Sequence, residues 1–354
     1  MTNHMVDYYQ KVLGALACGG MGDALGAATE LYTIDEIKGR FNGLIDEFQT
    51  PAPDTFAGSL NGVKGLITDD ASQMYVFAEG LIETGKMNFD NQSWIKCLLR
   101  WADMEPYANY KGPTTEQVIK ALKEGRPTNK IGVIGTSNRQ APNVGSTNGA
   151  AMRVAPAGLV WPSEPEKACE LAFLTCMPSH DTNIAIASAC AIAAAVSKAM
   201  SADASVNSIV EAALEGARYG EQIAAERARV VAGPKIEYRL QLALDIAARN
   251  NDLETFLREL EGYVGNSVNA HESVPTAIAI FAFCEGDPWR TIHASANAGN
   301  DTDSIGTMAG AIAGAYKGFT ALPQDKYHQF LTVNKKDFDV ERISRELSKL
   351  CYLN

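Results

Sequence analysis

Five carboxylate side chains, in stretches of the chain poor in other charges, are the best candidates for chemistry. Four lie in two short clusters, Thr68-Asp69-Asp70 and Asn300-Asp301-Thr302-Asp303-Ser304, and the fifth is Glu30. No Lys or Arg occurs in 68–80 or 291–316 to pair with them. Carboxylates gathered in a packed region repel one another and lose water, so each must be protonated, paired or bound to a cation. If the clusters meet in space, a hard divalent cation bound through oxygen is the simplest explanation.

Each cluster also has a purely structural interpretation. Thr68 can cap the helix expected after it, and acidic residues such as Asp301 and Asp303 in a first turn complement a helix dipole. The hydroxyl groups of Thr68 and Ser304 beside the carboxylates nevertheless favour an oxygen-rich site for Mg²⁺, Mn²⁺ or Ca²⁺. Such a site could hold two ions, which clamp oxygens and lower the pKa of a water molecule. Glu30 could either ligate a cation or accept a proton.

Small residues recur at every fourth position in three segments. The rows are Gly14, Cys18, Gly22 and Gly26; Ala185, Ala189, Ala193 and Ser197; and Gly306, Gly310, Gly314 and Gly318. Residues i and i+4 share one face of a helix, and small side chains there let another helix approach closely. Because the first and third rows adjoin the acidic residues, crossed helices would bring 23–30, 68–70 and 300–304 together.

Helical periodicity dominates the rest of the chain and predicts an all-α, compact multi-helix fold. We expect helices over 8–28, 70–85, 91–103, 114–124, 148–159, 165–177, 182–200, 205–219, 236–249, 252–264, 273–284, 287–298, 303–318 and 340–350. Glycine- and proline-rich loops are expected at 41–66, 105–114, 125–147 and 233–236. None of these loops resembles a flexible interdomain linker, so we expect one domain over residues 1–354. Two helical lobes divided near 150–165 are the alternative.

Charge and composition limit the partners. The 354 residues carry a net charge of −11, which argues against a nucleic-acid-binding surface. Residues 1–10 are polar and the uncharged stretch 182–197 is too short for a bilayer, so neither a signal peptide nor a membrane segment is expected. Seven cysteines without a C-x-x-C pair favour free thiols in a reducing compartment. We therefore expect a cytoplasmic protein without nucleic-acid or membrane partners; its oligomeric state is not predicted.

Several motifs follow one another along nearly the whole chain. They are a glycine-rich segment ending in glutamate (14–30), I-T-D-D-A-S-Q-M (67–74), K-G-P-T-T-E-Q-V-I-K-A-L (111–122), G-S-T-N-G-A-A-M-R-V-A-P-A-G-L (145–159), Ser179-His180, E-S-V-P (272–275) and N-A-G-N-D-T-D-S-I-G-T-M-A-G-A-I-A-G-A-Y-K-G (297–318). In this order they resemble the ADP-ribosylglycohydrolase family. The chain departs from the family pattern at Ala71, Thr147, Asn300 and Ser304. Thr147 and Asn300 add bulk beside the expected ligand loops.

The resemblance implies an all-α fold and a site for two divalent cations, Mg²⁺ or Mn²⁺. The implied metal ligands are Thr68, Asp69, Asp70, Asp301, Asp303 and Ser304. Glu30 is the implied catalytic residue, assisted by Asp70 and Asp303, and the residues implied to contact ADP-ribose are Gly145, Ser146, Asn148, Gly149 and His180. From the residues alone, 145–149 could be a phosphate cradle or a simple helix N-terminus, and His180 could be a capping or core histidine.

The prediction is therefore a metal-dependent hydrolase that cleaves the glycosidic bond at C1 of a ribose, in ADP-ribose linked to an acceptor. One alternative is a hydrolase of a nucleoside or another small ribosyl metabolite, suggested by the changes at Ala71, Thr147 and Asn300. Another is a non-catalytic ADP-ribose-binding or structural protein, against which the four aspartates and Glu30 argue.

Overall fold

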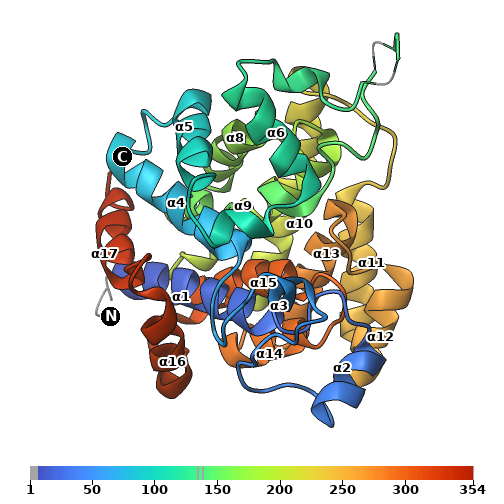
Figure 1. The fold of residues 1–354 in the computed structure, drawn as a ribbon. Coiled ribbons are helices and arrows are strands. Elements are labelled where there is room, and N and C mark those ends of the chain that lie inside the picture. The colour runs from blue at the N-terminus through green and yellow to red at the C-terminus, as the bar shows by residue number, and fades with distance from the viewer. Residues whose placement is uncertain (1–6, 134, 138, 354) are drawn as a thin grey trace.

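The computed structural model describes residues 7–133, 135–137 and 139–353, which form helices joined by loops (Figure 1). The α-helices are α1 (Tyr8–Gly26), α2 (Ile34–Phe41), α3 (Phe56–Ser59), α4 (Asp69–Thr84), α5 (Asn91–Trp101), α6 (Pro113–Lys123), α7 (Ala155–Leu159), α8 (Pro165–Cys176), α9 (Asn183–Ala199), α10 (Val206–Arg227), α11 (Ile236–Arg249), α12 (Leu253–Tyr263), α13 (Ala270–Phe283), α14 (Pro288–Ala296), α15 (Thr302–Lys317), α16 (Gln324–Asn334) and α17 (Val340–Leu350). Short 3-10 helices are η1 (Tyr107–Tyr110), η2 (Thr128–Lys130), η3 (Asn148–Ala150) and η4 (Phe319–Ala321). Within the described residues, β pairing is limited to isolated bridges. The predicted all-α fold is confirmed.

Helices α1 and α15 lie against each other at the centre of the molecule (Figure 1). A Cβ atom on Gly22 would lie 2.2 Å from the carbonyl oxygen of Gly306, and one on Gly26 would lie 2.5 Å from the amide nitrogen of Asp303. Only glycine permits backbones to approach this closely. The predicted packing of the first small-residue row on the third is confirmed, and it places the end of α1 beside the start of α15.

The second small-residue row belongs to α9, which is buried along almost its whole length. A Cβ atom on Gly158 of α7 would lie 2.5 Å from the carbonyl oxygen of Ala193, and one on Gly216 of α10 would lie 2.5 Å from that of Cys190. The small side chains of α9 thus admit close neighbours on more than one side. One cluster of buried apolar side chains extends from Val12 to Leu350.

The prediction of one continuous helix over 148–159 is wrong for residues 151–154. The chain instead forms η3 and then α7, separated by residues 151–154. Pro156 has no amide hydrogen to donate to the carbonyl of residue 152, and it lies in the first turn of α7, where proline is tolerated. The sequence prediction also ended α10 eight residues early, at 219 instead of Arg227, and missed α2, α3 and α16. A capping box, Thr33 with Glu36, marks the start of α2 and was visible in the sequence.

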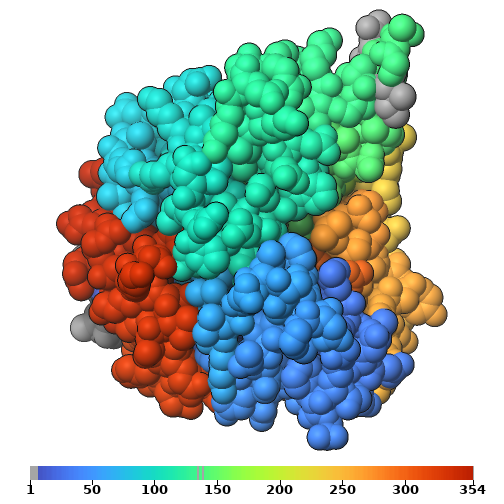
Figure 2. All heavy atoms as spheres, viewed as in Figure 1, coloured from blue at the N-terminus to red at the C-terminus, as the bar shows by residue number. Residues whose placement is uncertain are grey.

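Segments far apart in the sequence meet on the face shown in Figure 2, where blue N-terminal, green central and orange C-terminal residues adjoin. In the described part of the chain, no helix combines the length and apolarity needed to cross a membrane.

Candidate active site

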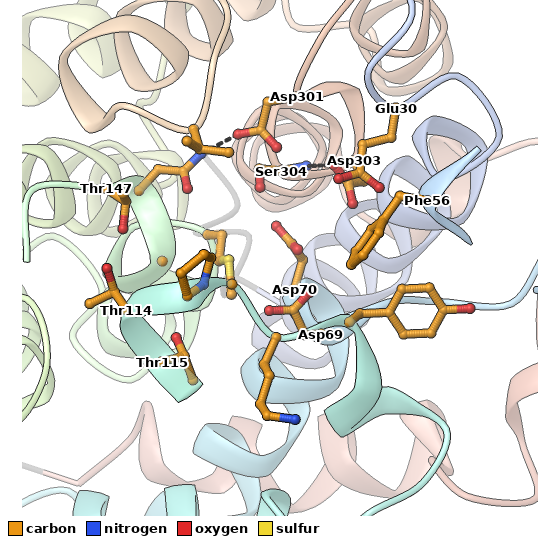
Figure 3. Close-up of a pocket in the computed structure, with 18 of the residues that line it drawn as sticks. Glu30, Phe56, Asp69, Asp70, Thr114, Thr115, Thr147, Asp301, Asp303 and Ser304 are labelled. Atoms are coloured by element: carbon orange, nitrogen blue, oxygen red, sulfur yellow. Dashed lines mark hydrogen bonds between the residues drawn. The ribbon is translucent and has the colours of Figure 1, made fainter. Parts of the chain in front are cut away.

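The five carboxylates gather at one cavity of about 340 Å³ (Figure 3). They come from the loop after α1, the first turn of α4, and the start of α15. The cavity is lined by the predicted site residues Glu30, Asp69, Asp70, Asn148, Gly149, His180, Asp301, Asp303 and Ser304. The structure therefore brings the two sequence clusters together, as the crossing of α1 and α15 led us to expect.

Asp23, a residue absent from the predicted site, fixes the start of α4. This aspartate is fully buried on α1, and its carboxylate accepts hydrogen bonds from the backbone amides of Thr68 (3.0 Å) and Ala71 (2.9 Å). The Thr68 hydroxyl lies 3.3 Å from Asp70 Oδ2 and 3.5 Å from Asp303 Oδ2. Thr68 thus lies behind the cavity wall and joins α4 to α15. A lone aspartate inside a glycine-rich, apolar helix was the available sequence signal.

Two backbone hydrogen bonds join the loop of Glu30 to the loop of Asp301. The amide of Leu31 donates to the carbonyl of Asn300 (2.7 Å), and the amide of Asn300 donates to the carbonyl of Tyr32 (2.8 Å). Leu31 and Asn300 both adopt left-handed conformations, with φ of 66° and 58°. Asparagine tolerates this conformation better than most residues. The side chain of Asn300 does not line the cavity, so its predicted bulk falls outside the site.

The carboxylates lack the partners that buried charges need. Glu30, Asp301 and Asp303 each offer an oxygen that lies within 4.8 Å of the other two. Among the described residues, none of the five is in an ion pair with Lys, Arg or His, and the buried atoms Glu30 Oε2 and Asp70 Oδ1 have no hydrogen-bond partner.

Burial and mutual repulsion act on the protonation of this group. Burial, and then Asp303 and Asp301, raise the pKa of Glu30 well above its usual range. Burial and then Asp303 raise the pKa of Asp70 to about 8. Without a cation these carboxylates would hold protons. An all-oxygen donor set with unpartnered atoms fits a hard divalent cation.

We call Glu30, Asp69, Asp70, Asp301 and Asp303 the acidic group. A wall of the cavity without charged side chains faces this group. We call it the neutral wall and define it as Thr147, Asn148, Gly149, Met152 and His180. The side-chain amide of Asn148 donates to Asp301 Oδ2 (2.5 Å) and to Ser273 Oγ (2.8 Å), which ties the wall to the acidic group. A Cβ atom on Gly149 would lie 2.8 Å from His180 Nε2, so the ring reaches the wall only because residue 149 is glycine.

Gly145 and Ser146, predicted to contact ADP-ribose, lie behind the neutral wall. The carbonyl of Gly145 accepts from Thr182 Oγ1 (2.7 Å), and the Ser146 hydroxyl donates to the carbonyl of Pro142 (2.7 Å). The amide of Asn148 donates to the carbonyl of Val268 (2.9 Å). The amide of Asn148 is thus used within the protein, and the phosphate cradle over 145–149 stays a prediction.

Sequence reasoning did not include several residues of the remaining wall. Phe56 and Tyr110 line the cavity, with ring centroids 6.0 Å apart in an edge-to-face arrangement. Burial, followed by the nearby carboxylates, raises the pKa of Tyr110 to about 12. Lys111 and the first turn of α6 complete this side. The helix over 114–124 was predicted and is α6, and the K-G-P-T-T motif before it could have indicated that its start belongs to the site. Phe56 follows a loop whose course no local pattern predicts.

The sequence model of the ADP-ribosylglycohydrolase family matches residues 4–352. The chain belongs to the ADP-ribosylglycohydrolase family. Uncharacterised protein YegU of Escherichia coli is 32% identical over 335 residues, which cover 93% of this chain and 94% of YegU. ADP-ribosylhydrolase ARH3 of Gallus gallus is 28% identical over 329 residues, which cover 88% of this chain and 86% of ARH3.

A solved structure described as an ADP-ribosylglycohydrolase-related protein complex has the same fold. Its TM-score is 0.67 at 20% sequence identity, and the match covers 98% of this chain and 100% of that one. This ADP-ribosylglycohydrolase family member therefore combines a glycohydrolase fold with a cavity that holds five carboxylates.

Proposed function

We propose that this protein hydrolyses the glycosidic bond at C1 of ADP-ribose joined to an acceptor, with the help of divalent cations. The observation that carries the proposal is the convergence of Glu30, Asp69, Asp70, Asp301 and Asp303 on one cavity, without paired basic residues in the described part of the chain. Membership of a glycohydrolase family supports it.

The cations would be held by the acidic group. Glu30, Asp301 and Asp303 offer converging oxygens, and Asp69, Asp70 and Ser304 line the same cavity. The Thr68 hydroxyl lies between Asp70 and Asp303. A bound Mg²⁺ or Mn²⁺ would supply positive charge that orients ribose hydroxyl groups and offsets the repulsion among the carboxylates.

Glu30 would act on the water molecule. Its Oε2 has no hydrogen-bond partner among the described residues, so it is free to orient water and accept its proton. As the water oxygen bonds to C1, the old bond breaks with its electron pair going to the leaving atom. The ribose carbon gains oxocarbenium-like positive charge at this point. Asp70 and Asp303 supply fixed negative charge close by, which would stabilise it.

The neutral wall would hold the ADP-ribosyl portion. Asn148, Gly149 and His180 line the cavity there. Phosphates would avoid the carboxylates and lie toward the neutral wall.

We also propose that the chain forms one domain over residues 1–354 and works in the cytoplasm. The single large apolar cluster, with members from every part of the described chain, supports one domain.

The test is release of ADP-ribose from ADP-ribosyl-arginine and ADP-ribosyl-serine peptides, with free nucleosides as competing substrates. Turnover of an ADP-ribosylated substrate is expected with MgCl₂ or MnCl₂ and should stop with a chelator. Glu30→Gln should abolish it, whereas Glu211→Gln, at an exposed position of α10, should not.

Turnover of nucleosides alone would contradict the proposed substrate. If no cation binds in calorimetry while Asp301→Ala still binds ADP-ribose like the wild type, the protein is a binder and not an enzyme.

A further inference from the structure

A chain of hydrogen bonds runs behind the cavity from the acidic group to the neutral wall. Arg153, which is fully buried, lies at its middle and donates to Gln73 Oε1 (2.9 Å) and to Ser179 Oγ (3.2 Å). In one direction, Gln73 Nε2 donates to Asp69 Oδ2 (3.3 Å). In the other, Ser179 Oγ lies 2.7 Å from His180 Nδ1. A single guanidinium thus supports both sides of the site.

The chemistry of these groups sets the direction of the bonds. A guanidinium can only donate, so Ser179 Oγ accepts from Arg153. Among the described residues, the acceptor within reach of the Ser179 proton is His180 Nδ1. That nitrogen is therefore unprotonated. Burial, followed by the charge of Arg153, lowers the pKa of His180 well below its usual range, so the ring is neutral. Its single proton then belongs to Nε2.

The next bond ends on Thr147. His180 Nε2 lies 3.1 Å from Thr147 Oγ1, and with its proton on Nε2 the ring donates to the threonine oxygen. The proton of the Thr147 hydroxyl then has no acceptor among the described residues. Thr147 is half-buried and lines the cavity, so this proton is available to a ligand.

We infer that Thr147 is a substrate-binding residue whose hydroxyl donates to a phosphate oxygen of the ADP-ribosyl group. His180 acts through Thr147 as a positioning residue, because its one N–H is already used. Figure 3 shows Thr147 across the cavity from Glu30 and Phe56, so an anionic group bound there would lie on the opposite side from the carboxylate that would act at C1. This inference rests on the proposed function, which supplies the phosphate.

The direction of the hydrogen bonds between Ser179, His180 and Thr147 can be tested without any ligand. ¹⁵N NMR of the native protein, with the His180 signals assigned by loss in His180→Gln, should show the Nε2–H tautomer. Ser179→Ala should shift the ring toward a mixture of tautomers, a change that a merely structural role for Ser179 would not produce. A native ring with its proton on Nδ1 would reverse the last two bonds and overturn the inference.

The ligand contact is tested by calorimetry with ADP-ribose in MgCl₂. Loss of one hydrogen bond to a charged acceptor should weaken ADP-ribose binding about tenfold in Thr147→Val, with KM raised and kcat nearly unchanged. Thr147→Ser should bind like the wild type, and so should the control Thr332→Val at an exposed position of α16. Binding of adenosine, which has no phosphate, should not respond to Thr147→Val.

The two failures are distinguishable. If the wild type does not bind ADP-ribose at all, the proposed function fails. If the wild type binds it and Thr147→Val binds equally well, the inference fails while the proposed function stands. Should Thr147→Val not fold, Thr147→Ala and the tautomer measurement decide the question.

Discussion

The acidic group and the neutral wall face the same cavity but satisfy their buried polar atoms in different ways. His180 has a hydrogen-bond partner at both ring nitrogens, and Ser179 connects it to the charged Arg153 behind it. The acidic group keeps buried oxygens of Glu30 and Asp70 without partners. The buried ring of His180 is therefore satisfied within the protein, whereas the acidic group requires protons or an added cation.

The two regions meet in the cavity at the side chain of Asn148. Its amide donates to Asp301 on one side, while its backbone belongs to the neutral wall. Arg153 joins the same two regions from behind through Gln73 and Ser179. Cation binding and ligand binding should therefore be separable by mutation within each region, and coupled at Asn148.

The largest expected effect comes from removing one charge from the acidic group. Asp303→Asn and Asp70→Asn should each lower kcat/KM by about a thousandfold or more, because a lost cation contact removes several kcal/mol of transition-state stabilisation. Helical content by circular dichroism should remain unchanged. The matched control is Asp245→Asn, at an exposed position of α11. Loss of the helical signal in the variants would show that the aspartates support the fold instead.

An intermediate effect is expected where the regions meet. Asn148→Asp replaces a donor to Asp301 with a carboxylate that repels it, so both cation affinity and kcat/KM should fall, about 10- to 100-fold for a group that orients a metal ligand. Asn109→Asp, at an exposed position of η1, controls for the added charge. Wild-type activity in Asn148→Asp would mean that the two regions do not depend on each other there.

The smallest effect is expected on stability, at the helix crossing that carries the acidic group. Gly22→Ala would place a Cβ atom 2.2 Å from the Gly306 carbonyl oxygen, so α1 and α15 must separate, at a cost of about 1–3 kcal/mol in the free energy of unfolding. Gly39→Ala in α2 has open space around the added atom and should stabilise by up to about 1 kcal/mol. Denaturant midpoints measure both; changes of the same sign would contradict the close packing.

The meeting of the acidic residues could be predicted because its causes repeat in the sequence. Rows of small residues at every fourth position specify which helices touch, and the acidic residues adjoin two of those rows. The amino-acid sequence contains no comparable pattern for Asp23. This residue matters because its carboxylate accepts hydrogen bonds from the amides of Thr68 and Ala71. That contact depends on the arrangement of α1 and α4 in space.

The neutral wall was predicted less completely, for two physical reasons. The helix expected over 148–159 is divided into η3 and α7, and Pro156 lies in the first turn of α7, so the position of Asn148 and Gly149 depends on η3 and not on a regular helix. The direction of the hydrogen bonds at His180 depends on Arg153, far away in the sequence, and on the orientation of a ring. No local pattern in the sequence predicts the contact with Arg153 or the orientation of the His180 ring.

The pair of backbone hydrogen bonds between Leu31, Tyr32 and Asn300 has a consequence for motion. Because the Glu30 loop and the Asp301 loop donate to each other, neither can open while the other stays closed unless both bonds break. Hydrogen exchange at the amides of Leu31 and Asn300 would therefore report one opening event with one free energy. Local unfolding of the site would release a proposed catalytic group and a proposed cation ligand at the same moment.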